Sequence, residues 1–103
     1  MRRLNAAGTL RRMAPASYAM FWSIGDGPRN VGRVELAADQ LSLSPTTRGA
    51  GIDVTRFRDL VRVLLERGTL RVERRTQPPL TIGSLDTPGA LRELAERLSA
   101  AVG

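Results

Sequence analysis

Short runs in which apolar and polar residues alternate recur along most of the chain. Successive side chains of a β-strand point to opposite faces, so a period of two is typical of a strand with one face buried. Glycine, proline and aspartate gather between the runs and predict turns. Six segments show this alternation and are predicted strands: 17–24, 31–37, 41–44, 52–54, 70–74 and 80–82.

The first of these segments holds three of the four aromatic residues of the chain. The period of two places Tyr18, Met20 and Trp22 on one face of the strand, which we expect to contribute to the core. Phe21 then points to the opposite face.

The pattern changes near the C-terminus, where apolar residues recur every three or four positions. This period predicts an amphipathic helix that ends near Ala101. Asp86 and Thr87 are both candidate N-caps, and Pro88 suits the first helical position. Glu93 and Arg97 are spaced to form an ion pair one turn apart. The predicted buried face consists of Leu91, Leu94, Ala95, Leu98 and Val102.

Segment 56–67 fits two patterns. Its apolar residues fall at i, i+3, i+4, i+7 and i+8, which predicts a helix capped by Gly68. Val61, Val63 and Leu65 also alternate with their neighbours, and 67–69 then forms a hairpin turn into the next strand. Local pattern alone leaves both alternatives open.

The segments ERGTLRV (66–72), PLTIGSL (79–85) and PGALREL (88–94) carry a resemblance to a known family. Together with the strands before them, they make residues 16–102 similar to small bacterial proteins with a pleckstrin-homology-like (PH-like) domain. The resemblance implies a mainly β fold, a seven-stranded antiparallel barrel or sandwich of two near-orthogonal sheets capped by one C-terminal α-helix. It favours the strand alternative for 60–66. The predicted organisation is a basic N-terminal tail, 1–14, followed by a PH-like domain, 15–103.

Composition narrows the possible functions. The chain has 103 residues and contains no Cys and no His, so the usual general base, thiol nucleophile and commonest metal ligand are missing. We therefore expect a non-enzymatic protein with no catalytic residues, no cofactor and no metal. No apolar run approaches the length of a membrane-spanning helix, and we expect a cytoplasmic location.

An unidentified protein or peptide is the partner that the sequence favours. If Val61, Val63 and Leu65 face the core, then Leu60 and Leu64 face outward, and Phe21 faces outward on the first strand. We predict these three side chains as partner contacts. Exposed apolar side chains and open sheet edges also fit self-association, so a homo-oligomer is a further expectation.

The alternative function is binding to an anionic surface, either acidic lipid headgroups or nucleic acid. The net charge is +6, and the first 13 residues hold four arginines and no acid. PH-like domains that bind lipids use basic residues beside the first hairpin loop, and this chain has only two there. We therefore rank anionic partners below a protein partner. The candidate anion contacts are Arg29, Arg33, Arg67, Arg71 and Arg75.

Overall fold

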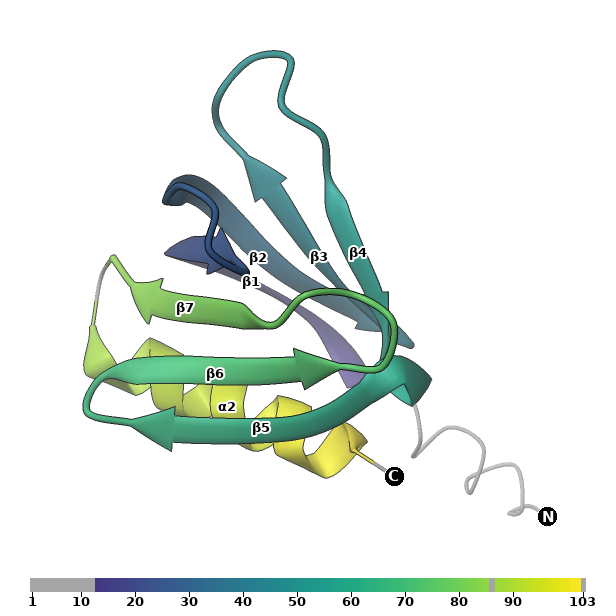
Figure 1. Cartoon of the computed structure of the whole chain (residues 1–103). Helices are drawn as coiled ribbons and strands as arrows, with labels where there is room; N and C mark the ends of the chain where they lie inside the picture. Colours follow the sequence, from purple (N-terminus) through teal and green to yellow (C-terminus); the bar gives the residue numbers. More distant parts are fainter. Residues whose placement is uncertain (1–12, 86, 103) are drawn as a thin grey trace, which may run out of the picture.

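A curled antiparallel sheet and one C-terminal helix make up the computed structural model, which describes residues 13–85 and 87–102 (Figure 1). The predicted mainly β class with one C-terminal helix is confirmed. In chain order the elements are β1 (Met13–Ile24), β2 (Asn30–Ala38), β3 (Gln40–Pro45), β4 (Asp53–Arg56), the 3₁₀ turn η1 (Phe57–Asp59), β5 (Leu60–Glu66), β6 (Thr69–Arg74), β7 (Leu80–Ser84) and α2 (Pro88–Ala101).

The strands form one continuous sheet in the order β4-β3-β2-β1-β7-β6-β5. The seven antiparallel strands are as expected, but they form one hydrogen-bonded sheet and not two. The reason is the length of β1, which pairs with β2 over most of its residues and with β7 through residues 20–24. Strong twist curls this sheet into a half-barrel (Figure 1). β1 already begins at Met13, inside the predicted tail, whereas residues 1–12 lie outside the described part of the chain.

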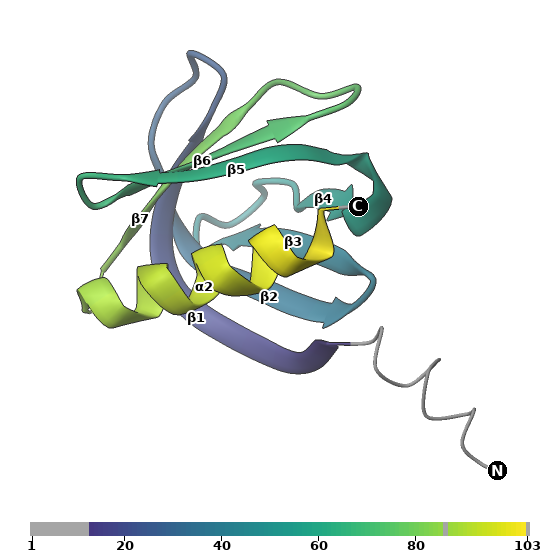
Figure 2. The same cartoon turned by 90° about the horizontal axis from the view of Figure 1, so that it is seen from below.

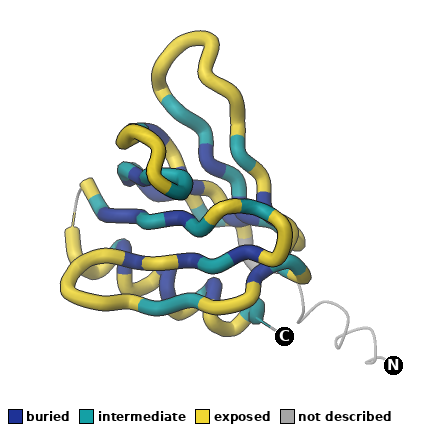
Figure 3. The backbone as a smooth tube through the Cα atoms, viewed as in Figure 1, coloured by how far each residue is buried: buried dark blue, intermediate teal, exposed yellow. Residues whose placement is uncertain are grey.

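Helix α2 spans the open end of the half-barrel and completes the core (Figure 2). It begins as predicted, because Thr87 is the N-cap, its hydroxyl accepts a hydrogen bond from the Ala90 amide, and Pro88 follows. Four of its five predicted core residues are buried, and Val102 is partly buried. They belong to one core cluster with alternate residues of the sheet, among them Met20 and Trp22. Figure 3 shows buried and exposed residues alternating along the strands. None of the described helices is long and apolar enough to cross a membrane.

Segment 56–67 is a 3₁₀ turn followed by a strand, so the strand alternative is correct for Leu60–Glu66. The predicted orientation of its first residue is wrong, because Leu60 is buried in the core. A β-bulge shifts the register between Leu60 and Arg62. The extra residue, Val61, is left 48% exposed, while Leu60 and Val63 both turn inward.

Strand β4 places its polar residues towards the interior. Thr55 is buried, whereas the aliphatic side chains of Ile52 and Val54 are exposed. The partner of this inner face is Arg74 at the end of β6, whose side chain is fully buried. Its Nη1 lies 2.6 Å from Asp53 Oδ1 and 3.0 Å from Thr55 Oγ1, and its Nε donates to the Pro78 carbonyl at 2.8 Å. We call these four residues the Arg74 clasp, since they join β4 to β6 and the β6–β7 loop.

Tyr18 provides a polar link between the sheet and α2. Its hydroxyl donates a hydrogen bond to Glu93 Oε2 at 2.5 Å, and Glu93 also pairs with Arg97 at 3.6 Å as predicted. Burial raises the pKa of Tyr18 to about 12, and the hydrogen bond and negative charge of Glu93 add to this effect.

We expect the stability of the protein to fall as the pH rises from about 10 to about 12. The folded state holds the neutral phenol more tightly than the unfolded state, in which the pKa is about 10. The contribution of Tyr18 to the free energy of unfolding is therefore complete below pH ~10, and it is lost as the pH rises through the pKa of the folded state. Tyr18 is the only tyrosine, so phenolate absorbance reports it directly. Tyr18→Phe should show no such loss in urea unfolding, and a midpoint near 10 in the folded protein would contradict the assignment.

Candidate functional site

The outer edge of β5 is the open edge of the sheet. In the described part of the chain β5 pairs only with β6. The opposite edge, β4, is four residues long and is covered by the Arg74 clasp and by Gln77, whose side-chain amide donates to the Val54 carbonyl at 3.5 Å. Open edges present unpaired N–H and C=O groups to which another strand can hydrogen-bond. Strand addition is therefore geometrically open at β5 and obstructed at β4.

Three hollows lie beside this edge, along the boundary between β5 and α2. We call the surface they form the β5–α2 groove. One hollow, of about 260 Å³, is lined by Val61, Val63 and Val102 with two polar residues. A second, of about 390 Å³, extends from Val61 past the C-terminal end of α2 towards η1. Both are lined by aliphatic side chains with polar groups at the rim, the composition expected of a surface that takes apolar side chains.

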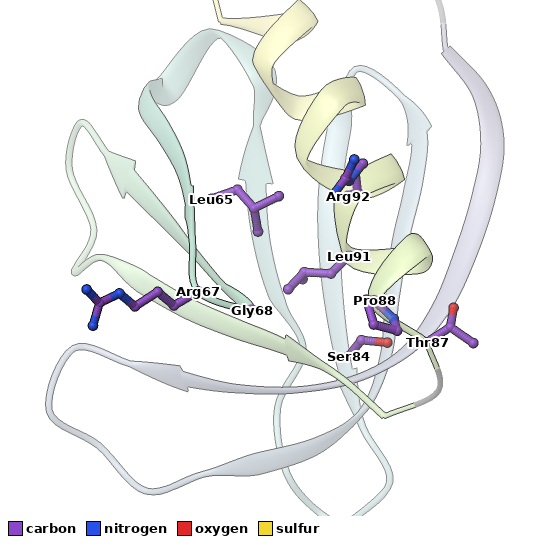
Figure 4. A pocket seen from close by; sticks show the side chains of 8 residues that line it. All are labelled: Leu65, Arg67, Gly68, Ser84, Thr87, Pro88, Leu91 and Arg92. Atoms are coloured by element: carbon purple, nitrogen blue, oxygen red, sulfur yellow. The ribbon is translucent and has the colours of Figure 1, made fainter.

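The third hollow, of about 440 Å³, lies between the C-terminal end of β5 and the first turn of α2. Figure 4 shows Leu65 of β5 and Leu91 of α2 pointing towards one another across it. Leu65 is 40% exposed, so this large aliphatic side chain remains only partly covered by the helix. Gly68 and Pro88 complete the wall, and the hydroxyl residues Ser84 and Thr87 lie at one side.

The charged residues that line the groove in the described part of the chain all have the same sign. None of the described residues that line the three hollows is an aspartate or a glutamate, whereas five are arginines: Arg58, Arg62, Arg67, Arg75 and Arg92. Among the described residues only Arg75 of these forms an ion pair, with Asp59 at 4.0 Å. Arg67 points away from the helix (Figure 4), so it flanks the hollow rather than filling it. The groove therefore offers an apolar floor with a positive border.

The three predicted partner contacts lie in different places. Leu60 belongs to the core, and its prediction as an exposed contact is wrong. Leu64 does face outward, because it stands opposite the exposed Arg71 of β6, and it is half-buried. Phe21 is also half-buried on the outer face, far along the sheet order from β5. Its ring packs on Gly83 and lies under the Arg29 guanidinium, 4.3 Å from the ring centre.

The five predicted anion contacts divide into two groups. Arg29 and Arg33 accompany the β1–β2 hairpin, and Arg33 donates to Ser17 at 2.9 Å. Arg67, Arg71 and Arg75 accompany β6, which is separated from β1 by β7. Arg71 pairs with Glu73 at 3.4 Å and Arg75 with Asp59. All five are exposed, and they belong to two segments of the chain, the β1–β2 hairpin and β6 with its flanking turns.

The pattern of the sequence missed the residues that form the groove. The strand alternative placed Val61 and Leu65 on the core face because they alternate with Arg62, Leu64 and Glu66, but both are at least 40% exposed. Leu91 was assigned correctly to the buried face of the helix, but its position beside Leu65 depends on how α2 packs on the sheet. One signal in the sequence could have indicated these residues. Segment 56–67 fits both the helical period and the strand period, and a strand with apolar residues on both faces gives this pattern.

The remaining chemistry of the described residues is limited. They contain no group of three or more Asp, Glu, His or Cys side chains placed to hold a metal ion. The sequence matches no protein-family model and no curated protein. The fold and the groove therefore provide the evidence about function.

Proposed function

We propose that this chain is a PH-like, non-enzymatic binding module that recognises an extended segment of a protein or peptide. The observation that carries the proposal is the combination of an open β5 edge with an apolar groove directly beside it. A peptide that adds to β5 gains main-chain hydrogen bonds from the edge. Its alternate side chains then enter the groove, which supplies the selectivity.

The chemistry of the groove border favours a segment that alternates apolar and acidic residues. Apolar side chains fit the hollows at Val61 and Leu65. The carboxylates between them project from the opposite face of the added strand, the outer face on which Arg62 of β5 lies. Binding to acidic lipid headgroups or nucleic acid has less support, because the candidate arginines are split between two parts of the sheet.

We expect a synthetic ten-residue peptide that alternates valine with aspartate to bind, and its valine–lysine counterpart to bind at least about tenfold more weakly. Hydrogen exchange should slow at the amides of Val63 and Leu65 when the acidic peptide is added. Leu65→Asp should abolish binding, because it puts a carboxylate into the apolar hollow.

Val54→Asp is the matched control for this experiment. Val54 and Leu65 are both 40% exposed, and they lie in the two opposite edge strands. Val54→Asp should leave the affinity unchanged. Slower exchange in β4 instead of β5, or equal loss of binding in both variants, would refute the site. A lipid- or nucleic-acid-binding protein would instead bind anionic vesicles or DNA, with an affinity that falls steeply with salt.

A further inference from the structure

The sequence of β5 is self-complementary about Leu64, the fifth of its seven residues. On the outer face of the strand Arg62 and Glu66 lie symmetrically on either side of Leu64, and on the inner face Val63 and Leu65 do so. Neither Arg62 nor Glu66 has an ion-pair partner among the described residues, although both are exposed. The strand therefore presents two charges of opposite sign at matching distances from Leu64.

The direction in which the main-chain N–H and C=O groups of β5 point is also compatible with self-pairing about Leu64. Arg67 and Gly68 form a two-residue turn with φ of 48° and 78°, the positive values of a type I′ hairpin. In such a hairpin the flanking pair, Glu66 and Thr69, is hydrogen-bonded. The amide groups of Leu65 and Val63 therefore point away from β6, towards the open edge.

We propose that the β5 edge pairs antiparallel with β5 of a second copy of this chain, with the two Leu64 residues facing each other at the two-fold axis. This register places Val63 opposite Leu65 of the second copy, and both of these residues direct their amide groups outward. It also places Arg62 opposite Glu66 of the second copy. Each contact occurs twice, as a two-fold interface requires.

Other registers of the β5–β5 pairing satisfy fewer of the hydrogen bonds, apolar contacts and charge pairs. A shift of the second strand by one residue sets outward-pointing amides against inward-pointing ones, so the ladder is lost. A two-fold axis at Val63 preserves the hydrogen bonds, but it sets Arg62 against Leu64 and Glu66 against Leu60. The axis at Leu64 is the register in which hydrogen bonds, apolar contacts and charges agree.

The proposal rests on the proposed function in one respect, because both need a β5 edge that accepts a strand. The two occupants then compete for it, and self-pairing covers the edge until a partner segment displaces the second copy. The contact involves five residues of a chain with net charge +6, so we expect a reversible dimer at high protein concentration rather than a permanent one.

Sedimentation equilibrium on the full chain tests the proposal through charge swaps. Arg62→Glu and Glu66→Arg should each weaken the dimer by about tenfold, because each sets like charges opposite one another. The double variant should restore it. If association were governed only by repulsion between the net positive charges of the two chains, the result would differ. Arg62→Glu lowers the net charge and would then strengthen association. A chain that stays monomeric at millimolar concentration, or a dimer that neither single swap weakens, overturns the proposal.

The same samples separate this proposal from the proposed function. Binding of the valine–aspartate peptide to a protein that never dimerises overturns self-pairing and supports peptide recognition. A charge-swap-sensitive dimer that the peptide neither binds nor dissociates supports self-pairing and overturns peptide recognition. Dissociation of the dimer by the peptide supports both, and failure of both measurements overturns both.

Discussion

Replacing Arg74 with Met is expected to lower the free energy of unfolding by about 3–5 kcal/mol. The fully buried guanidinium holds Asp53, Thr55 and the Pro78 carbonyl together. The Asp53 side chain is only 16% exposed, so without Arg74 a largely buried carboxylate loses its counter-ion. Domains of this size are typically stable by only about 5–15 kcal/mol, so the loss is a large fraction of the total.

Arg75→Met is the matched control, because it removes the neighbouring arginine from a surface site. The Arg75 side chain is 63% exposed and lies 4.0 Å from Asp59, and we expect its loss to cost less than about 1 kcal/mol. Urea unfolding at low and high salt measures both variants, and salt should reduce only the smaller effect. If Arg74→Met does not fold, Arg74→Lys tests the same point. If the residue-74 and residue-75 variants lost the same free energy of unfolding, the clasp would not hold β4 in place.

Introducing a single methyl group at Gly32 is expected to cost about 3 kcal/mol, near the upper end for overpacking. Gly32 lies in β2 opposite Met20 and Pro45. A Cβ at this position would stand 2.1 Å from the Ser44 carbonyl oxygen and 2.9 Å from Pro45 Cα. Both of these atoms belong to the backbone of β3, so the clash is relieved only if β2 and β3 move apart.

Gly51→Ala is the corresponding control, because nothing lies within 4 Å of a Cβ at that exposed position. It should be neutral or slightly stabilising through the unfolded state. Thermal unfolding followed by circular dichroism measures both variants. A Gly32→Ala protein that melts with the wild-type protein would mean that β2 and β3 approach each other less closely than the structure indicates.

The two edges of the sheet differ in the side-chain contacts that lie at them. The Arg74 clasp occupies the inner face of β4 and ties this edge to the β6–β7 loop. Among the described residues, no corresponding clasp lies at β5, where the groove runs beside the strand. Strengthening one edge while leaving the other open directs any added strand to β5 and away from unspecific pairing.

The sequence by itself determined most of the elements, whereas its pattern left segment 56–67 open between helix and strand. Alternation placed Met20, Trp22 and the other inward-facing residues of the long strands correctly, and the Thr87-Pro88 cap with its leucine face defined α2. These features were predictable because each depends on neighbours within a few residues, and the period of a buried face is set by the local backbone geometry.

The tertiary structure alone decided the β5–α2 groove and the Arg74 clasp. The bulge at Val61, which buries Leu60, arises from pairing with β6, and the exposure of Leu65 arises from where α2 crosses the sheet. Asp53 is 21 residues from Arg74, and no local period connects them. Contacts between distant segments depend on twist, register and packing of the whole sheet, and a pattern of residues along the chain does not contain them.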